Sequence, residues 1–261
     1  MSKQLFAGEV GMARSMLYYD HKQWKKDWVT KQLIEAALEE NPSYGHKRLA
    51  IYLAMNKKRV LRVMRLFGIK PYRRRSRKPK KSNAVRGGTY PNLFRTMLPT
   101  RQNQAWVCDF TYLPYGNGFL YLATVMDVFT AEVVGWNVST THTATLTLNA
   151  LFAAVSNRSR PDMLHSDNGR EYVAKSYVGA LETLGISISR SKPGCPWENG
   201  YQESFYAQFK VDLGDPGRFS SVVELVCEIH QTVYRYNHTR IHTRFRMSPV
   251  QFATRQMTGV S

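Results

Sequence analysis

Three carboxylates lie in segments of the sequence where a charged side chain is unexpected. Asp109 lies in the apolar run WVCDFTYL, Asp167 closes MLHSDNG, and Glu203 lies in WENGYQESFYAQFK, with 35 residues between it and Asp167. Carboxylates in apolar surroundings are costly unless something neutralises them. Three that converge favour divalent cations, and Mg²⁺ is the oxygen-seeking candidate. Two such ions can activate a hydroxyl and stabilise a leaving oxygen on phosphorus, which indicates the cutting or joining of nucleic acid.

Several neighbouring polar residues are further candidates. Lys210 follows Glu203 by two helical turns, so it lies on the same face and could hold a phosphate, although a lone lysine is more often simply solvated. Asp127 either lies near the site or caps a turn. Glu198 either points away from Glu203 or sits in a first helical turn, where negative charge is favoured. His165, beside the second Asp, is more often a packing group than a base.

The charge is unevenly distributed along the 261 residues, which carry a net charge of +18. Residues 1–100 hold 23 Lys and Arg against 6 Asp and Glu, whereas residues 101–261 hold 14 against 13. A basic segment of this strength is typical of proteins that bind a polyanion. It exceeds what solubility alone requires.

Residues 1–70 read as an all-α region. DWVTKQLIEAALEENP is expected to bury Val29, Leu33, Ala36 and Ala37, and a short helix over GHKRLAIYLAM follows. A third helix over NKKRVLRVMRLFGI begins at an Asn56 cap, ends at Gly68 and buries Val60, Val63, Met64 and Phe67. Its basic residues project outward: Lys57, Lys58, Arg59, Arg62 and Arg65. This layout predicts a helix-turn-helix DNA-binding region, and a plain three-helix bundle is the alternative.

Residues 71–100 read as a basic linker. Positions 70–81 hold eight Lys and Arg, interrupted by Pro71 and Pro79. An extended run of this kind tracks phosphates and gives salt-sensitive affinity for double-stranded DNA. The DNA-binding candidates in it are Arg73, Arg74, Arg75, Arg77, Lys78, Lys80 and Lys81. A localisation signal is the other interpretation.

Residues 101–261 change to strand-like periodicity. QAWVCDFTYLPY and FLYLATVMDVF flank GNG as a hairpin, and AEVVGWNVST supplies a third strand. Helix, strand, helix, strand and helices follow, which predicts an α/β core with a mixed five-stranded sheet and helices on both faces. In this order Asp109 lies mid-strand, and Asp167 ends the fourth strand, where ligands collect in open sheets.

The cysteines and the apolar runs indicate the cell compartment in which the protein is expected. Cys108, Cys195 and Cys227 are odd in number, widely separated and not spaced as a zinc site, which fits a reducing cytosol. No apolar run reaches membrane-spanning length, and the first twenty residues lack a signal-peptide core. We expect a cytoplasmic bacterial protein that makes no membrane contact and associates with the nucleoid when bound to DNA.

The whole pattern resembles the DDE transposases of bacterial insertion sequences, specifically the second-frame (OrfB) product of the insertion-sequence "three" family, relatives of retroviral integrases. WVCDFTYL, HSDNGREY and ENGYQESFYAQFK resemble the three acid-bearing segments, with the family's 35-residue interval and a Lys one heptad on. YNHTRIHTRFRMSPVQF resembles the C-terminal stretch, and YGHKRLAIYL with KKRVLRVMRLFGIK resembles the helix-turn-helix. Glu198 in place of the usual Asp and Phe245-Arg246 in place of Leu-Gly are departures.

The resemblance implies an RNase H-like catalytic core in which Asp109, Asp167 and Glu203 bind two Mg²⁺ ions, with Mn²⁺ as a substitute. It implies strand cleavage and strand transfer at the element's terminal inverted repeats, joining them to target DNA. A homo-oligomer on DNA and a first-frame (OrfA) partner or fusion are also implied. Secondary site candidates are Asn168, Asn199, Arg240 and His242. The rivals are an RNase H-fold nuclease that only hydrolyses and a domesticated DNA-binding regulator.

Overall fold

The computed structural model describes residues 9–13, 15, 22–72, 90–95, 97–192 and 195–258. The chain divides into two compact units, Met1–Pro71 and Tyr72–Ser261. The basic run at 73–81, with its seven DNA-binding candidates, lies outside the described residues. Within the described part, no helix is both long enough and apolar enough to cross a membrane.

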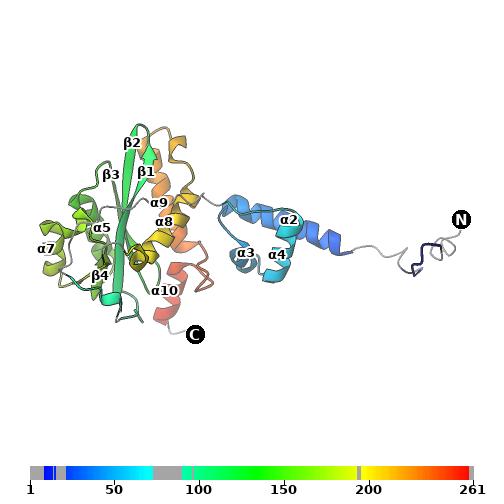
Figure 1. Cartoon of the computed structure of the whole chain (residues 1–261), viewed down its shortest axis with the longest axis horizontal. Helices are drawn as coiled ribbons and strands as arrows, with labels where there is room; N and C mark the ends of the chain where they lie inside the picture. Colours follow the sequence, from blue (N-terminus) through cyan, green and yellow to red (C-terminus); the bar gives the residue numbers. More distant parts are fainter. Residues whose placement is uncertain are drawn as a thin grey trace. The chain divides into compact units, whose positions relative to one another are not determined.

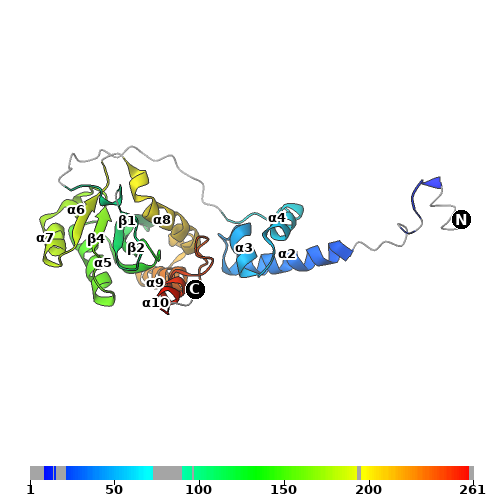
Figure 2. The ribbon, with the colours of Figure 1, turned by 90° about the horizontal axis from the view of Figure 1, so that it is seen from below.

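The first unit contains three consecutive helices, α2 (Lys22–Glu40), α3 (His46–Tyr52) and α4 (Lys57–Leu66), which Figure 2 shows gathered together. The Asn56 side chain caps α4 by accepting the N–H of Lys58 at 2.8 Å, as the sequence predicts. Gly68 follows the helix with φ of +65°, a conformation that suits glycine. Val60, Val63 and Met64 are buried, which confirms these three members of the predicted apolar stripe of α4, whereas Phe67 is half-buried.

The predicted buried face of α2 is wrong. Val29 and Leu33 are 54% and 42% exposed, Ala36 is also exposed, and only Ala37 of the predicted set is buried. The buried positions are Asp27, Thr30, Ile34 and Ala37. Arginines from α4 bind two of these residues, Asp27 and Thr30. Polar contacts with α4 therefore bury a face of α2 that the apolar pattern alone does not predict.

The second unit is built on a mixed five-stranded sheet. Its strands are β1 (Ala105–Tyr115), β2 (Gly118–Asp127), β3 (Val133–Ser139), β4 (Met163–Ser166) and β5 (Ser187–Arg190), in the order β3-β2-β1-β4-β5. The first three strands pair antiparallel, and β1–β4 and β4–β5 pair parallel. The expected hairpin and the five-stranded mixed sheet are confirmed.

Helices cover both faces of the sheet, as Figure 1 shows. The helices α5 (Ala144–Asn157), α6 (Arg170–Val173) and α7 (Lys175–Thr183) contribute to one apolar cluster, and α8 (Gly200–Leu213) and α9 (Val222–His238) contribute to the other. Alternation along β1 sends Trp106 and Cys108 into the first cluster and Val107 and Leu113 into the second. A final helix, α10 (Pro249–Thr258), follows α9.

Gly135 lets α5 approach the edge strand β3. A Cβ at this position would stand 2.4 Å from the carbonyl oxygen of Ala150 and 2.6 Å from the nitrogen of Ala154. Because both atoms belong to the backbone of α5, neither can move aside cheaply. A side chain here would therefore push α5 away from the sheet.

Candidate active site

The pairing of β1 with β4 brings Asp109 and Asp167 together. Val107 lies opposite His165 in this parallel pair, and Asp109 and Asp167 are each two residues further along. Asp167 directly follows the end of β4. Both predicted strand positions are therefore confirmed, and side chains two residues apart on a strand point to the same face.

The pKa of Asp109 shows which charged side chains lie near its carboxyl group. The pKa of the Asp109 carboxyl is raised to about 8, chiefly by burial and then by the charge of Asp167. Glu203 also raises the Asp109 pKa, whereas Lys210 lowers it. The fold therefore brings Asp167, Glu203 and Lys210 within electrostatic reach of Asp109, although these residues come from the end of β4 and from α8.

Backbone amides fix the two aspartates. The carboxylate Oδ1 of Asp109 accepts the N–H of Phe110 at 2.8 Å, and Oδ1 of Asp167 accepts the N–H of Gly169 at 2.8 Å. Burial raises the pKa of Asp167 too, while the Gly169 bond lowers it and the charge of nearby Glu171 raises it. Within the part of the chain that the structure describes, no hydrogen bond is made to the second oxygen of either carboxylate, which could therefore bind another ligand.

A buried arginine supports the loop that carries Asp167. Arg190, at the end of β5, is only 3% exposed. Its Nη1 donates to Ser166 Oγ at 2.8 Å and to the Asp167 carbonyl at 3.0 Å, and its Nη2 donates to the Tyr172 carbonyl. The positive charge of Arg190 also lowers the pKa of Asp167, so it favours the ionised carboxylate.

The chemistry of the donors fits a divalent cation. Asp109 and Asp167 are neighbouring carboxyl groups whose pKa values are raised, chiefly by burial, so their ionised forms need a compensating positive charge. Among the described residues, no group of three His, Cys, Asp or Glu side chains is close enough to hold an ion as it stands. Glu203, in the first turn of α8, is exposed and is the carboxylate with room to move.

The comparisons decide the family. Two models described as "Integrase core domain" match residues 99–196 and 184–249. The chain is 30% identical over 239 residues to the transposase for insertion sequence element IS904 of Lactococcus lactis, covering 85% of this chain and 94% of that protein. Transposase InsF for insertion sequence IS3A of Escherichia coli is 33% identical over 159 residues, 59% of this chain and 55% of that protein.

This chain belongs to the IS3 family of DDE transposases. It is therefore a transposase of the integrase type, and its predicted enzyme class is confirmed. An uncharacterized 31 kDa protein of insertion element IS600 from Shigella sonnei is 34% identical over 232 residues, covering 83% of this chain and 84% of that protein.

Solved structures confirm the RNase H-like fold of the transposase. The HTLV-2 integrase catalytic core domain in complex with magnesium matches with a TM-score of 0.50 and 18% identity, over 59% of this chain and 98% of that chain. The simian T-cell lymphotropic virus intasome in complex with PP2A regulatory subunit B56 gamma matches with a TM-score of 0.52 and 19% identity, over 84% and 73%. At these identities the likeness concerns the fold alone.

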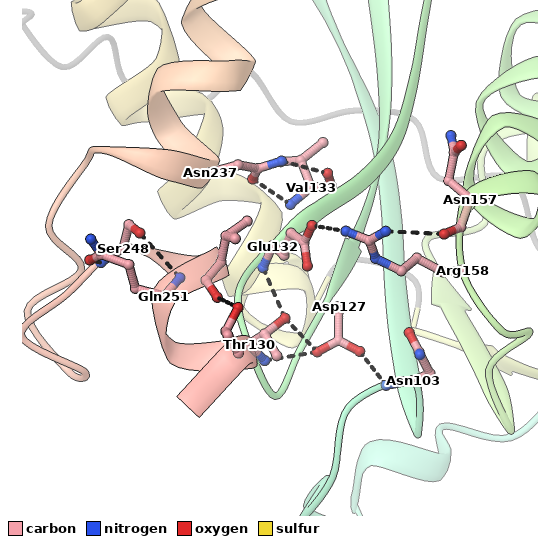
Figure 3. A network of polar contacts seen from close by, with 12 residues as sticks. Asn103, Asp127, Thr130, Glu132, Val133, Asn157, Arg158, Asn237, Ser248 and Gln251 are labelled. Atoms are coloured by element: carbon pink, nitrogen blue, oxygen red, sulfur yellow. Dashed lines mark hydrogen bonds and ion pairs between the residues drawn. The ribbon is translucent and has the colours of Figure 1, made fainter. Parts of the chain in front are cut away.

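The other acids of the transposase have structural partners. Asp127 accepts hydrogen bonds from the N–H of Asn103 at 2.7 Å and from both the N–H and the hydroxyl of Thr130, at 2.8 and 2.9 Å (Figure 3). Of its two predicted roles, turn capping is therefore confirmed. Glu198 lies in a short 3₁₀ helix, Pro196–Asn199, before α8, and its carboxylate accepts the N–H of Lys192 at 2.7 Å.

His165 is a packing residue, as predicted. Its ring is buried, Nδ1 lies 2.8 Å from Ser189 Oγ, and Phe94 packs edge-on at 4.9 Å between ring centroids. Burial lowers the pKa of His165 to about 4, so the ring is neutral at physiological pH.

The secondary site candidates from the sequence differ in their hydrogen bonds. Asn168 Nδ2 donates to the Ser191 carbonyl at 2.6 Å, and the buried Asn199 has an Oδ1 without a hydrogen-bond partner among the described residues. Arg240 is buried and binds Asp212 and Gln208.

The C-terminal stretch braces the catalytic unit. His242 pairs through its backbone with Met247, and its ring stacks on Phe245. Asn237 bonds both the N–H and the carbonyl of Val133, at 2.9 and 2.8 Å, at the start of β3 (Figure 3). Since Asp212 and Gln208 lie on α8, Arg240 ties the end of α9 to the helix that carries Glu203.

The basic residues of α4 fall into two groups. Arg62 places both terminal nitrogens on the buried Asp27, at 2.5 and 2.6 Å, and lowers the pKa of that carboxyl. Arg59 donates to Thr30 Oγ1 at 2.6 Å. Lys57 and Lys58 are exposed in the first turn of α4. All five predicted residues, Arg65 included, are on the surface, but Arg59 and Arg62 also join α4 to α2.

Three residues near the acids were missed from the sequence: Thr124, Gln202 and Tyr206. Each is buried and polar, and together they link β1 and β2 to α8. A signal was present, because Gln202 and Tyr206 are four residues apart and therefore lie on one face of the helix that carries Glu203.

Proposed function

We propose that this transposase cuts DNA strands at the terminal inverted repeats of its insertion sequence and joins the exposed 3′-hydroxyls to target DNA. The observation that carries the proposal is the convergence of charge on Asp109. Asp167, Glu203 and Lys210 all act on its carboxyl, although they come from distant parts of the sequence. Three acidic side chains and one lysine near one another fit phosphoryl transfer better than any other chemistry that these side chains support.

In this proposal Asp109, Asp167 and Glu203 hold two Mg²⁺ ions, and Mn²⁺ can replace them. When bound, such ions activate the attacking hydroxyl and stabilise the leaving oxygen. The HTLV-2 integrase core of the same fold was solved in complex with magnesium, which supports the choice of ion. Arg190 holds Asp167 in place and favours its ionised form.

Lys210 is proposed to bind a DNA phosphate beside the acids. Its Nζ lies 5.0 Å from the centre of the Tyr112 ring, on the exposed end of the β1–β2 hairpin. A cation over an aromatic face is attracted by the ring and is held near one position. Its charge also lowers the pKa of Asp109, so it favours the ionised form of that ligand.

We assign DNA binding to residues 1–70 and 71–100, and catalysis to residues 101–261. Lys57 and Lys58 on α4 and the run at 73–81 are the proposed phosphate contacts. Assembly as a homo-oligomer on DNA and action with a first-frame (OrfA) partner are part of the same proposal.

The test is a cleavage and joining assay on labelled duplexes taken from the gene's flanks, with Mg²⁺ or Mn²⁺. Asp109→Asn and Glu203→Gln should abolish both products while DNA binding persists. Asp162→Asn is the matched control, because Asp162 is an exposed acid that pairs with Arg101 on the surface. Cleavage without joining would favour the hydrolytic nuclease, and binding without chemistry would favour the regulator.

A further inference from the structure

A cluster of three buried polar side chains connects the strand of Asp109 with the helix of Glu203. We call Thr124, Gln202 and Tyr206 the α8 clamp. Thr124 is on β2, and the other two are on α8. Thr124 and Gln202 are 0% exposed and Tyr206 is 6% exposed, in the middle of an apolar interface between α8 and the sheet.

Hydrogen bonds satisfy the polar atoms of Gln202 in full. Its Nε2 donates to the carbonyls of Val107 and Thr124, at 2.8 and 3.3 Å, and its Oε1 accepts the Thr124 hydroxyl at 3.0 Å. A buried amide that lost these partners would be costly, so the bonds favour the observed position of α8 against β1 and β2. Neighbouring residues such as Phe205 and Phe209 already bury apolar surface between α8 and the sheet. Apolar contacts are not directional, so they fix the position of α8 less sharply than these hydrogen bonds do.

The clamp acts at residues adjacent to both acids. Tyr206 donates its hydroxyl to the backbone carbonyl of Asp109 itself, at 2.7 Å, and lies 2.8 Å from the Thr124 hydroxyl. Thr124 is the direct cross-strand partner of Asp109. Gln202 immediately precedes Glu203. The clamp therefore joins the backbone of the first acid to the helical turn of the third.

The geometry points to a positioning role. We propose that the α8 clamp sets the separation of Glu203 from Asp109 to suit a shared divalent ion, so that Thr124, Gln202 and Tyr206 determine metal affinity without touching the metal. Mg²⁺ requires near-ideal octahedral geometry, so a small shift of α8 changes affinity. Groups that orient metal ligands typically alter affinity by about 10–100-fold when removed. This inference rests on the proposed metal site.

The experiment measures Mn²⁺ binding to the full chain on a duplex from the gene's flanks. The signal of free Mn²⁺ is followed by electron paramagnetic resonance. The complex of the Asp109→Asn variant measures the Mn²⁺ that DNA phosphates bind, and this background is subtracted. Tyr206→Phe and Thr124→Val each remove a hydroxyl and retain the buried volume. Each is expected to weaken Mn²⁺ binding by about tenfold, and excess Mn²⁺ should restore strand cleavage.

Tyr115→Phe is the matched control. The hydroxyl of Tyr115 donates to the Phe219 carbonyl at 3.3 Å, at the edge of the same apolar cluster. This variant should bind Mn²⁺ like the unaltered chain. If the clamp variants lower the thermal midpoint but leave Mn²⁺ affinity unchanged, the clamp is merely structural and the inference is overturned. If Asp109→Asn binds Mn²⁺ as well as the unaltered chain, the proposed metal site itself fails and the inference falls with it.

Discussion

Asp109→Asn should stabilise the metal-free protein even though we expect it to abolish activity. Asparagine keeps an oxygen that can accept the Phe110 N–H, as Oδ1 of Asp109 does at 2.8 Å. It also removes a group that must bind a proton on folding at neutral pH, because the pKa of the half-buried Asp109 carboxyl is about 8.

The size of the effect follows from linkage. Each unit of pKa difference between the folded and unfolded chain corresponds to about 1.4 kcal/mol. At pH 7 the unfolded aspartate is ionised and the folded one is protonated, which sets an upper limit of about 4 kcal/mol on the stability lost. Relaxation and water around a partly buried group reduce this, so we expect a gain of about 1–4 kcal/mol and a rise in Tm of roughly 2–10 °C.

The assay is thermal unfolding of both proteins in chelator between pH 4 and pH 8. Above about pH 4 the unfolded carboxyl ionises while the folded one stays protonated until about pH 8. The unaltered chain therefore loses stability relative to Asp109→Asn as pH rises through this window, and the two converge near pH 4. Saturating Mn²⁺ should raise the Tm of the unaltered chain more than that of the variant.

A Tm for Asp109→Asn equal to or below that of the unaltered chain at pH 7.5, without metal, would refute this reasoning. It would mean that Asp109 is ionised and compensated within the fold, so that the site carries no excess negative charge. Asp162→Asn, at an exposed acid, should leave Tm nearly unchanged in the same series.

Three further predictions concern the framework. Arg240→Ala should cost about 2–4 kcal/mol in chemical denaturation, because it leaves Asp212 on α8 without its buried partner; a smaller loss would show that α9 does not brace α8. Gly135→Ala should destabilise the sheet unit by about 1–3 kcal/mol, since its Cβ meets the backbone of α5; an unchanged Tm would contradict that close approach. Arg62→Ala should lower the stability of α2–α4, measured by helical circular dichroism, more than Lys58→Ala does, because Arg62 forms the ion pair with buried Asp27; equal losses would argue against this.

The sequence predicted those parts of the fold that depend on local pattern. Alternation located β1 and β2, and the Asn56 cap and Gly68 located the ends of α4. The positions of Asp109 and Asp167 followed from the strand assignments, because strand ends define the edges of a sheet. These features depend on residues close together in the chain, where periodicity and capping carry the information.

Long-range polar contacts were not predictable in the same way. The buried face of α2 is set by Arg59 and Arg62, which are about thirty residues away in the chain, so the apolar pattern chose the wrong face. Gln202 and Arg190 looked like ordinary polar residues, and only the packing of α8 and β5 shows that they are buried at the site. In the sequence itself, a polar residue on an otherwise apolar face of a helix is the sign that indicates a buried, long-range polar contact.

The most direct test of the account is strand transfer by the full chain on labelled duplexes from the gene's flanks, in the presence of Mg²⁺. The account predicts metal-dependent cleavage and joining that disappear in Asp109→Asn and Glu203→Gln, persist in Asp162→Asn, and leave DNA binding intact in all three. Cleavage and joining that survive in either of the first two variants would contradict the assignment of these acids as the catalytic centre.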